Sequence, residues 1–373
     1  MPPAPQVLQV QSGALVAHRL LDVANEIDLS RAEALWASHA GRQSRRTHLA
    51  TAAANELTFG VPPTLLTLAP VEVDLEGTFI RAEMTARLYD FGAIVIALRL
   101  PVSGLSWNHF TRCFNALDRI TGADSPLWRD ALRSVIDVIG PALHRPAAEH
   151  LEEDYLFAIV HAFEQPMSAA QILEQANLPA LLSGETRPLS AQEAAAITEQ
   201  AYSYFEDDLV VLNWDRSFLY EPRRDSDVID IIEVANAQLL EMRYYDELLD
   251  TELAQMYELV ANAHGGLSLL ASRRAARLAR RLYGLVAEVT ELTERVENSL
   301  QVTEDVYLAR IYGAALDLFR VPRLSAAVDR KLAIIRDTYI ALYDEASSRR
   351  AELLELAIVL LIVFEIVLAL ARP

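Results

Sequence analysis

Hydrophobic and polar positions follow two different periods along the chain, and the period changes at Pro222. Before Pro222, short apolar or alternating runs typical of strands are separated by amphipathic stretches typical of helices. The expected strands are residues 14–24, 64–75, 79–88, 93–102 and 155–163, and residues 202–220 are also β-prone. The expected helices are residues 29–39, 106–121, 125–143 and 190–199. The pattern predicts an α+β protein with a flexible N-terminus at residues 1–12 and a mixed α/β domain at residues 13–222.

Residues that favour helix starts and turns support these boundaries. A short polar side chain before a helix accepts a hydrogen bond from a backbone N–H group that has no partner within the helix. Such residues precede four expected helices, and they are Asp28, Ser106, Ser125 and Ser168. Ser190 begins an S-x-x-E capping box. The segment from Tyr89 to Gly92 is expected to turn between two strands.

Beyond Pro222 the apolar positions recur every three or four residues, which is the spacing of helices that pack along their length. Three such seams run over residues 228–260, 271–296 and 328–346, and the glycines after His264 predict the end of the first helix. The pattern predicts an antiparallel hairpin or coiled coil over residues 223–350. Whether the partner helices belong to one chain or to several stays open. The seam positions expected to set register or oligomeric state are Asp246, Leu249, Leu285, Val289 and Leu292.

Asp246 is the one polar residue on the first seam, and it has two interpretations. A buried polar residue on a seam specifies register or oligomeric state at a cost in stability. Alternatively, the helix is slightly rotated so that Tyr245 faces inward.

A long apolar run closes the chain. As a helix, residues 353–371 would be about 28 Å long, close to the hydrocarbon thickness of about 30 Å. We therefore expect residues 351–373 to form one C-terminal transmembrane helix, a tail anchor that inserts into membrane lipid. The alternative is a helix buried inside a soluble oligomer. The residues of the expected anchor are Leu353, Leu356, Ile358, Leu361, Phe364, Glu365 and Leu368.

The charges at both ends of the expected anchor predict its orientation. Arg349 and Arg350 precede the run and only Arg372 follows it, so the positive-inside rule places the large body in the cytoplasm. Glu365 inside the run has three interpretations: a contact between anchors of neighbouring protomers, an ion path, or a tolerated protonated side chain. The abundance of Ala and Arg favours a bacterial source and hence a bacterial inner membrane.

Charge and cysteine content exclude some function classes. The formal net charge is −19 and the pI is near 4.9, so the body repels phosphate backbones and direct DNA binding is not expected. Cys113 is the only cysteine, which excludes an intramolecular disulfide and a multi-cysteine metal site. The N-terminus carries no secretory signal pattern.

The sequence contains no dinucleotide-binding, phosphate-loop, hydrolase-elbow or zinc-protease signature. Cys113 is expected to be a buried thiol rather than a nucleophile. One cluster combines imidazoles and carboxylates, namely His144, Glu149, His150, Glu153 and Asp154. It either supplies metal ligands to a membrane-bound hydrolase or metal-dependent enzyme, or is a solvated entry to the next strand. No catalytic residue is assigned and no cofactor is expected.

Five arginines lie within just over two helical turns of the second seam, all outside its apolar positions. They are Arg273, Arg274, Arg277, Arg280 and Arg281. They either contact an anionic partner such as RNA, a ribosome or anionic lipid, or pair with acidic residues of the preceding helix.

Four segments together resemble a known family. They are YDFGAIVI at residues 89–96, NWDRSFLYEP at 213–222, VYLARIYGAALDLFRVP at 306–322 and SSRRAELLELAIVLLIVFEIVLAL at 347–370. The chain is similar to the "required for meiotic nuclear division" family, also called domain of unknown function 155, of which it resembles a bacterial-type member. The resemblance implies a homo-oligomer with a C-terminal anchor, because eukaryotic relatives are mitochondrial inner-membrane proteins that support mitochondrial translation. It implies no catalytic residues.

The leading hypothesis is a membrane-tethered, self-associating scaffold without catalysis, whose α/β domain binds an unknown cytosolic partner. A link of that partner to the translation machinery rests on the resemblance alone. The alternatives are an enzyme that uses the cluster from His144 to Asp154, and an RNA or ribosome adaptor that acts through Arg273–Arg281.

Overall fold

The computed structural model describes residues 8–39, 44–46, 62–147, 150–224, 227–263 and 305–370, together with a few positions between 280 and 290. The chain divides into two compact units. The first comprises residues 1–243 and 295–322, and the second comprises residues 244–294 and 323–373.

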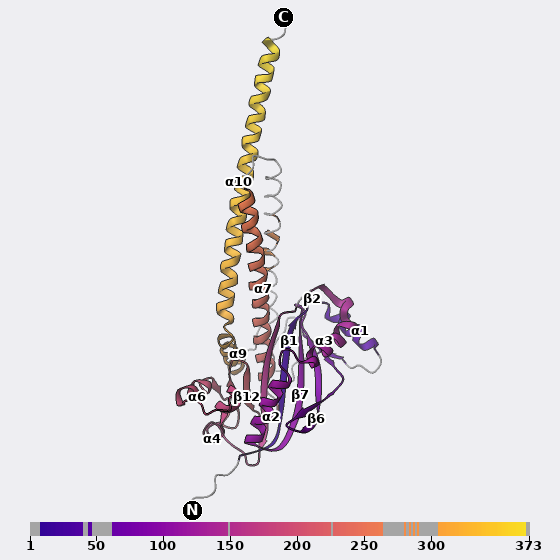
Figure 1. Cartoon of the computed structure of the whole chain (residues 1–373), viewed down its shortest axis with the longest axis vertical. Helices are drawn as coiled ribbons and strands as arrows, with labels where there is room; N and C mark the ends of the chain where they lie inside the picture. Colours follow the sequence, from indigo (N-terminus) through magenta and orange to yellow (C-terminus); the bar gives the residue numbers. More distant parts are fainter. Residues whose placement is uncertain are drawn as a thin grey trace, which may run out of the picture. The chain divides into compact units, whose positions relative to one another are not determined.

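The first unit is built on a large sheet (Figure 1). Ten strands of the described chain form it, in the order β10-β11-β12-β9-β1-β7-β6-β4-β3, with β5 paired to β6. A separate two-stranded sheet joins β2 and β8. The strands are β1 (Gln9–Asp22), β2 (Ala24–Ile27), β3 (Ser44–Arg46), β4 (Thr64–Thr67), β5 (Val71–Leu75), β6 (Thr78–Leu88), β7 (Ala93–Ser106), β8 (Leu143–Pro146), β9 (Glu152–Phe163), β10 (Ala201–Tyr202), β11 (Leu209–Leu212) and β12 (Arg216–Tyr220).

The helices of the described chain differ greatly in length. They are α1 (Leu29–Ser38), α2 (Trp107–Ile120), α3 (Pro126–Ile139), the 3-10 turn η1 (Gly140–Ala142), α4 (Ala169–Gln175), α5 (Leu178–Ser183), α6 (Ala191–Ile197), α7 (Val228–Ala263), α9 (Val306–Leu318) and α10 (Val321–Leu370). The mixed α/β domain followed by long C-terminal helices is consistent with the expected order of elements.

Strand β1 lies at the centre of the sheet because it is apolar on both faces. It pairs antiparallel with β7 and with β9, so that Leu15 lies between Leu100 and Ala158. Strand β12 pairs parallel with β9, which requires a crossover through α4, α5 and α6. A sheet buried on both faces reads as continuous apolar runs, and this explains why β1, β7 and β9 were recognisable in the sequence.

The two faces of the sheet are covered by different elements. Leu15 and Ala17 belong to the main core, in which Phe110 and Phe114 of α2 and Trp128 of α3 are buried. Successive strand residues point to opposite faces, so His18 and Leu20 lie on the other face. Hydrogen bonds join that second face to α7, through Asp230 and Glu233 for example.

Local signals in the sequence correctly mark several element boundaries. The Asp28 side chain accepts a hydrogen bond from the backbone N–H of Arg31, and Ser168 forms a complete capping box with Gln171. The expected turn at residues 89–92 is confirmed, and its Gly92 has φ 104°. A Cβ at Gly92 would lie 1.6 Å from the carbonyl oxygen of Ala24, so only glycine fits there.

Two residues separate the last two helices. Helix α9 ends at Leu318, Arg320 adopts φ 59°, and α10 begins at Val321. Pro322 lies in the first turn of α10, where its missing N–H would have no partner within the helix in any case. The expected break near Pro322 is therefore the start of the 50-residue α10.

The structure corrects the prediction of a transmembrane anchor. Within the described part of the chain, no helix is long and apolar enough to cross a membrane. The run of α10 from Ile358 to Val367 includes Glu365, whose carboxyl group is costly to place in the hydrocarbon region of a bilayer. The residues assigned to that anchor were Leu353, Leu356, Ile358, Leu361, Phe364, Glu365 and Leu368.

The expected single-pass location in a bacterial inner membrane depended on this anchor. It is wrong for the same reason, since no described helix could cross a membrane. The expected orientation of the anchor depended on Arg349 and Arg350. Both residues are part of α10, and only their backbone is described.

Candidate functional site

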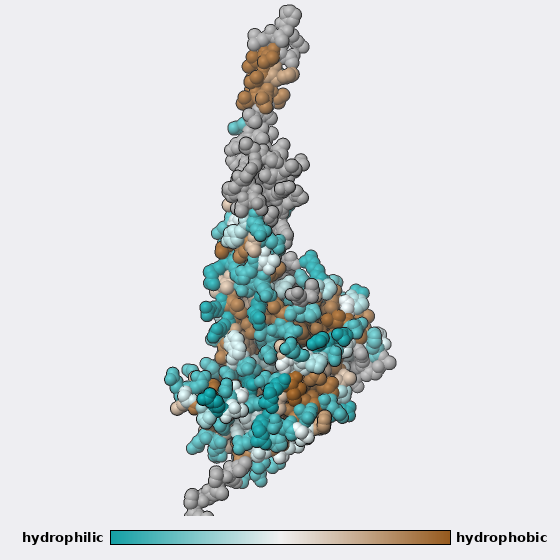
Figure 2. All heavy atoms as spheres, in the orientation of Figure 1, coloured by the Kyte–Doolittle hydropathy of each residue, from teal (hydrophilic) through white to brown (hydrophobic). Residues whose placement is uncertain are grey.

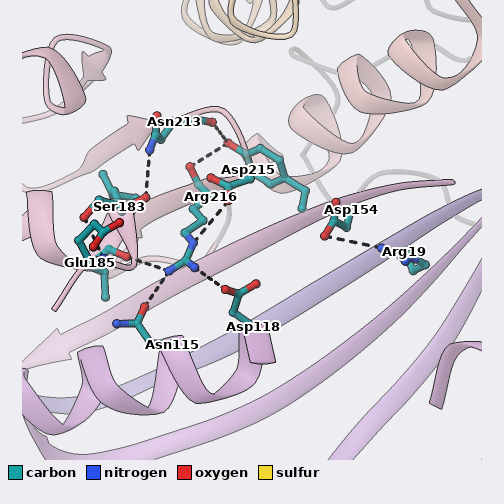
Figure 3. A network of polar contacts seen from close by, with 12 residues as sticks. Arg19, Asn115, Asp118, Asp154, Ser183, Glu185, Asn213, Asp215 and Arg216 are labelled. Atoms are coloured by element: carbon teal, nitrogen blue, oxygen red, sulfur yellow. Dashed lines mark hydrogen bonds and ion pairs between the residues drawn. The ribbon is translucent and has the colours of Figure 1, made fainter. Parts of the chain in front are cut away.

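A buried arginine organises one end of the sheet. Arg216 begins β12 and is 5% exposed. Its Nη1 donates to Oδ1 of Asn115 at 2.7 Å, and its Nη2 donates to Oδ2 of Asp118 at 2.5 Å. Both partners come from α2 (Figure 3). Because Arg216 and Asp118 are oppositely charged and hydrogen-bonded, this contact fixes the start of β12 to α2.

The turn before Arg216 is fixed by a second set of contacts. The Tyr155 hydroxyl lies 2.9 Å from the carbonyl oxygen of Asn213 and 3.1 Å from that of Arg216. The Asn213 side chain donates to the carbonyl oxygen of Leu182 at 2.9 Å. Burial raises the pKa of Tyr155 far above its ordinary value, so the hydroxyl stays a hydrogen-bond donor. The segment that the sequence shows as NWDR is therefore a rigid turn.

A charged cluster lies on the opposite face of the sheet, under the start of α7. Arg87 donates to Oδ1 of Asp230 at 2.5 Å and to Oε1 of Glu233 at 3.0 Å. The Tyr89 hydroxyl donates to the same Glu233 oxygen at 2.6 Å. Nδ1 of His18 lies 3.4 Å from Glu233 Oε2. We call His18, Arg87, Tyr89, Asp230 and Glu233 the His18 cluster.

Burial sets the charges of the His18 cluster. Burial, together with the smaller effect of the neighbouring Arg87, lowers the pKa of His18 to about 3, so the imidazole is neutral near pH 7. Burial and the Glu233 carboxylate raise the pKa of Tyr89 well above its ordinary value. Three of the five side chains are at most 4% exposed, so the cluster binds α7 to the sheet and offers no access to a substrate.

The described residues of the predicted His/carboxylate cluster do not converge on one site, because three of them contact separate partners. His144 is exposed on β8, and Nδ1 of His150 lies 3.0 Å from the backbone carbonyl oxygen of Asp22. Glu153 forms an ion pair with Arg243, and Asp154 lies 3.6 Å from Arg19. Glu149 is outside the described residues. Among the side chains that the structure describes, no group of three His, Cys, Asp or Glu residues could hold a metal ion.

Two further features of the described residues offer little to catalysis. Cys113 is buried on α2, and burial raises the pKa of its thiol, which keeps it in the unreactive protonated form. A pocket of about 270 Å³ lies beside the end of β9 and the start of α4. Glu164 is its only ionisable lining residue, and four of the other eight are glutamines, so it lacks an acid–base pair.

The second unit contains an ion pair that sequence reasoning missed. Nζ of Lys331 lies 2.7 Å from Oδ1 of Asp246 and 2.7 Å from Oδ1 of Asp250. Tyr245 is 1% exposed whereas Asp246 is partly exposed, which agrees with the interpretation of a rotated helix. Lys331 is the only lysine in the chain, and this rarity was the one signal that could have drawn attention to it.

The structure describes only some of the residues predicted to form the helix seams and the arginine patch. Leu249 and Val289 are fully buried, whereas Leu285 and Leu292 lie outside the described residues. Of the five predicted arginines, only Arg280 is described, and it is exposed. Arg273, Arg274, Arg277 and Arg281 lie outside the described residues, so a contact with an anionic partner stays a prediction.

Two groups of exposed apolar side chains in the described chain could contact a partner. The first is the run Ile358–Val367 on α10, seen as a brown band near the end of that helix (Figure 2). The second is a set of aromatic side chains in the first unit around Tyr204 and Phe205, which are 62% and 45% exposed. Such exposed apolar surfaces mark interaction sites more often than catalytic ones.

Comparison with known proteins gives a family without an assigned activity. The family model described as "Uncharacterized protein MJ0711, N-terminal domain" matches residues 12–227. A similar relative is the uncharacterized protein MJ0711 of Methanocaldococcus jannaschii, 26% identical over 196 residues. The alignment covers 52% of this chain and only 59% of the relative. No solved structure matches the chain.

These matches support the expectation of a domain of unknown function, but not the narrower naming for meiotic nuclear division or a bacterial type. By the match over residues 12–227, the chain belongs to the family described as uncharacterized protein MJ0711, N-terminal domain.

Proposed function

We propose that this protein is a self-associating scaffold in which the apolar end of α10 is buried by the same segment of other copies of the chain. Three or more copies form the assembly, and the α/β domains carry the sites for other partners. The proposal rests on one observation: the run Ile358–Val367 is exposed on every side of the helix.

The distribution of exposure around the helix argues for several copies rather than two. The nine apolar side chains of the run are between 51% and 65% exposed. Consecutive residues of a helix point in different directions, so these side chains surround its axis. A helix that is hydrophobic all round is normally buried on all sides, whereas a two-stranded coiled coil buries only one seam. At least two neighbouring helices are needed to cover the run.

The energy available fits an assembly of moderate affinity. Burial of the exposed part of each apolar side chain contributes about 1 kcal/mol, or on the order of 10 kcal/mol per copy. The loss of translational and rotational freedom costs roughly 4–15 kcal/mol. The two magnitudes are comparable, so assembly is expected to depend on protein concentration.

Substitutions on opposite faces of the run test the number of copies. One variant carries Val359→Ser, Ile362→Ser and Ile366→Ser, and the other carries Leu360→Ser, Leu361→Ser and Phe364→Ser. A control variant carries Ile334→Ser and Ile340→Ser, two exposed apolar positions earlier on α10. Sedimentation velocity of the full chain over a range of concentrations measures the oligomeric state of each variant.

We expect the unsubstituted chain and the control to form trimers or larger assemblies, and both face variants to dissociate into monomers. If only one face variant dissociates, a two-stranded contact replaces the proposed bundle. If the unsubstituted chain is monomeric in buffer at all concentrations, self-association is refuted. Co-flotation of that monomer with phosphatidylcholine vesicles would identify lipid as the occupant of the run and would also overturn the proposal.

We also propose, from the quoted motifs alone, that the chain is a bacterial-type member of the "required for meiotic nuclear division" family and that its unknown partner belongs to the translation machinery. Sedimentation of the full chain with purified ribosomes tests this part separately. Co-sedimentation that is lost when Arg273, Arg274, Arg277, Arg280 and Arg281 are all changed to Gln would support it. Absence of co-sedimentation at low salt would refute it without affecting the scaffold.

A further inference from the structure

Three aromatic rings form a continuous cluster on the surface of the first unit. The ring of Tyr204 lies 4.7 Å from that of Phe205 in an edge-to-face arrangement, and 5.4 Å from that of Tyr307 at the start of α9. Tyr204 is 62% exposed and the adjoining Val306 is 76% exposed, whereas Tyr307 is nearly buried. We call Tyr204, Phe205, Val306 and Tyr307 the Tyr204 surface.

The backbone that presents this surface is fixed, not loose. Both carboxylate oxygens of Asp208 accept backbone hydrogen bonds, from Tyr204 at 2.7 Å and from Phe205 at 3.0 Å. Asp305 accepts from the backbone N–H of Tyr307 at 2.7 Å and thereby caps α9. Two exposed aromatic side chains on a rigid turn lose little conformational entropy when a partner binds.

The rim of the surface is predominantly acidic. Glu206, Asp207 and Asp208 follow the two exposed rings, and Asp305 precedes Val306. Arg223 and Arg310 lie beside it, and Glu221 also acts on Tyr307, so carboxylates outnumber guanidinium groups among these described residues five to two. An acidic rim around aromatic rings attracts a cationic partner and repels phosphate groups.

Within the protein itself, the guanidinium group of Arg223 contacts both an aromatic ring and a carboxylate of this surface. The Arg223 guanidinium carbon lies 4.2 Å from the centre of the Phe205 ring, and Nη2 of Arg223 lies 3.8 Å from Oδ1 of Asp207. A site in which a cation stacks on an aromatic face and also pairs with a carboxylate favours arginine over lysine, because only the guanidinium group is planar. Arg223 stacks on Phe205, whereas the larger part of the Tyr204 side chain is exposed to solvent.

We propose that the Tyr204 surface is a docking site for an arginine-rich segment of a protein partner. An arginine of the partner stacks on Tyr204, its neighbours pair with the carboxylates of Glu206 and Asp207, and aliphatic carbons of the partner lie against Val306. The site lies in the α/β domain and does not depend on the apolar end of α10, so it stands whether or not the chain self-associates.

Binding of labelled peptides to the full chain tests the site. The probes are octa-arginine and octa-lysine peptides with a fluorophore, and fluorescence anisotropy is measured at 150 mM salt to limit the general attraction of the −19 charge. The variants are Tyr204→Ala and the double variant Glu206→Gln/Asp207→Asn. The matched control is Phe79→Ala, because Phe79 is 73% exposed on β6, outside the Tyr204 surface.

We expect octa-arginine to bind more tightly than octa-lysine. Tyr204→Ala should weaken octa-arginine binding about three- to tenfold, as the loss of one cation–π contact implies, and Phe79→Ala should leave it unchanged. The double carboxylate variant should also weaken binding. Equal binding of both peptides, or equal effects of Tyr204→Ala and Phe79→Ala, would mean that only net charge attracts the peptides and would overturn the site.

The same variants distinguish a nucleic-acid partner. If a single-stranded RNA oligonucleotide binds the full chain and Tyr204→Ala abolishes that binding, the aromatic rings serve as a base-stacking surface and the proposal for a protein partner is refuted. Unchanged thermal unfolding of Tyr204→Ala, monitored by circular dichroism, excludes a folding defect as the cause of any loss.

Discussion

The fold opposes protonation of His18, which is buried between the sheet and α7. Burial lowers its pKa from 6.5 to about 3, while Arg87 lies close by and Glu233 is only 3.4 Å away. In the unfolded chain His18 takes up a proton near pH 6.5, but in the folded chain it does so only near pH 3. At this site the unfolded state therefore binds more protons between these values, so the contribution of His18 to the free energy of unfolding falls as the pH falls through this range.

We predict that His18→Gln removes part of this pH dependence. From pH 6.5 toward pH 4, the free energy of unfolding should decrease by about 1 kcal/mol per pH unit less in His18→Gln than in the unsubstituted chain. The measurement is urea unfolding followed by tryptophan fluorescence, which reports on the first unit alone because all four tryptophans lie in it.

His144→Gln is the matched control, because His144 is exposed on β8. Asp22 acts in the opposite direction: burial raises its pKa to about 6, so its contribution to stability falls as the pH rises from about 4 to 6. The difference between variant and unsubstituted chain cancels Asp22 and isolates His18. An unchanged slope in His18→Gln would show that the buried imidazole is not kept neutral.

At the scale of elements, the described part of the second unit contains one cation placed between two carboxylates. Asp246 and Asp250 are four residues apart on α7, so their side chains lie on the same face and repel each other. Lys331 of α10 lies 2.7 Å from a carboxylate oxygen of each. It thereby offsets their repulsion and sets the relative register of the two helix segments.

We predict that Lys331→Met lowers the thermal stability of this unit. Methionine keeps the apolar part of the side chain but leaves the two carboxylates without their shared cation, at a cost of about 1 kcal/mol because the groups are partly exposed. Arg330→Met removes a cation from the adjacent exposed position and should have little effect. Circular dichroism at the helix band measures both. Equal melting of the two variants would contradict a specific role for Lys331.

The elements show which parts of the fold could be predicted. Strands β1, β7 and β9 were recognisable because burial on both faces makes them continuously apolar, and α1 and α4 because Asp28 and Ser168 cap them. The strand order was not predictable, since the parallel pairing of β12 with β9 depends on contacts between distant segments. The His18 cluster was hidden for the same reason, because its members come from β1, the β6 end and α7.

The C-terminal prediction failed for a different physical reason. Apolar composition describes how strongly a helix avoids water, but not what covers it. The run Ile358–Val367 is exposed in the described chain, and the alternative interpretation of a helix buried inside an oligomer stays a prediction. The same argument applies to Asp246, whose place on a seam did not reveal that Lys331 would be its partner.

At the scale of the whole molecule, net charge and apolar surface act against each other. Each copy carries a formal charge of −19, so copies repel when they approach, whereas burial of the α10 run draws them together. Salt shortens the range of the repulsion to about 10 Å at 0.1 M and about 3 Å at 1 M, and it leaves the apolar contact in place. Self-association should therefore tighten as salt increases.

We predict that the association constant of the full chain rises at least several-fold between 0.05 and 0.5 M sodium chloride, as measured by sedimentation equilibrium. This sign separates the apolar bundle from an assembly held by ion pairs between subunits, which would weaken over the same range because salt screens attraction as well as repulsion. The variant Leu360→Ser/Leu361→Ser/Phe364→Ser supplies the control, since it keeps the full charge but loses one apolar face. It should remain monomeric at every salt concentration, and association constants that fall with salt would refute burial of the α10 run as the driving force.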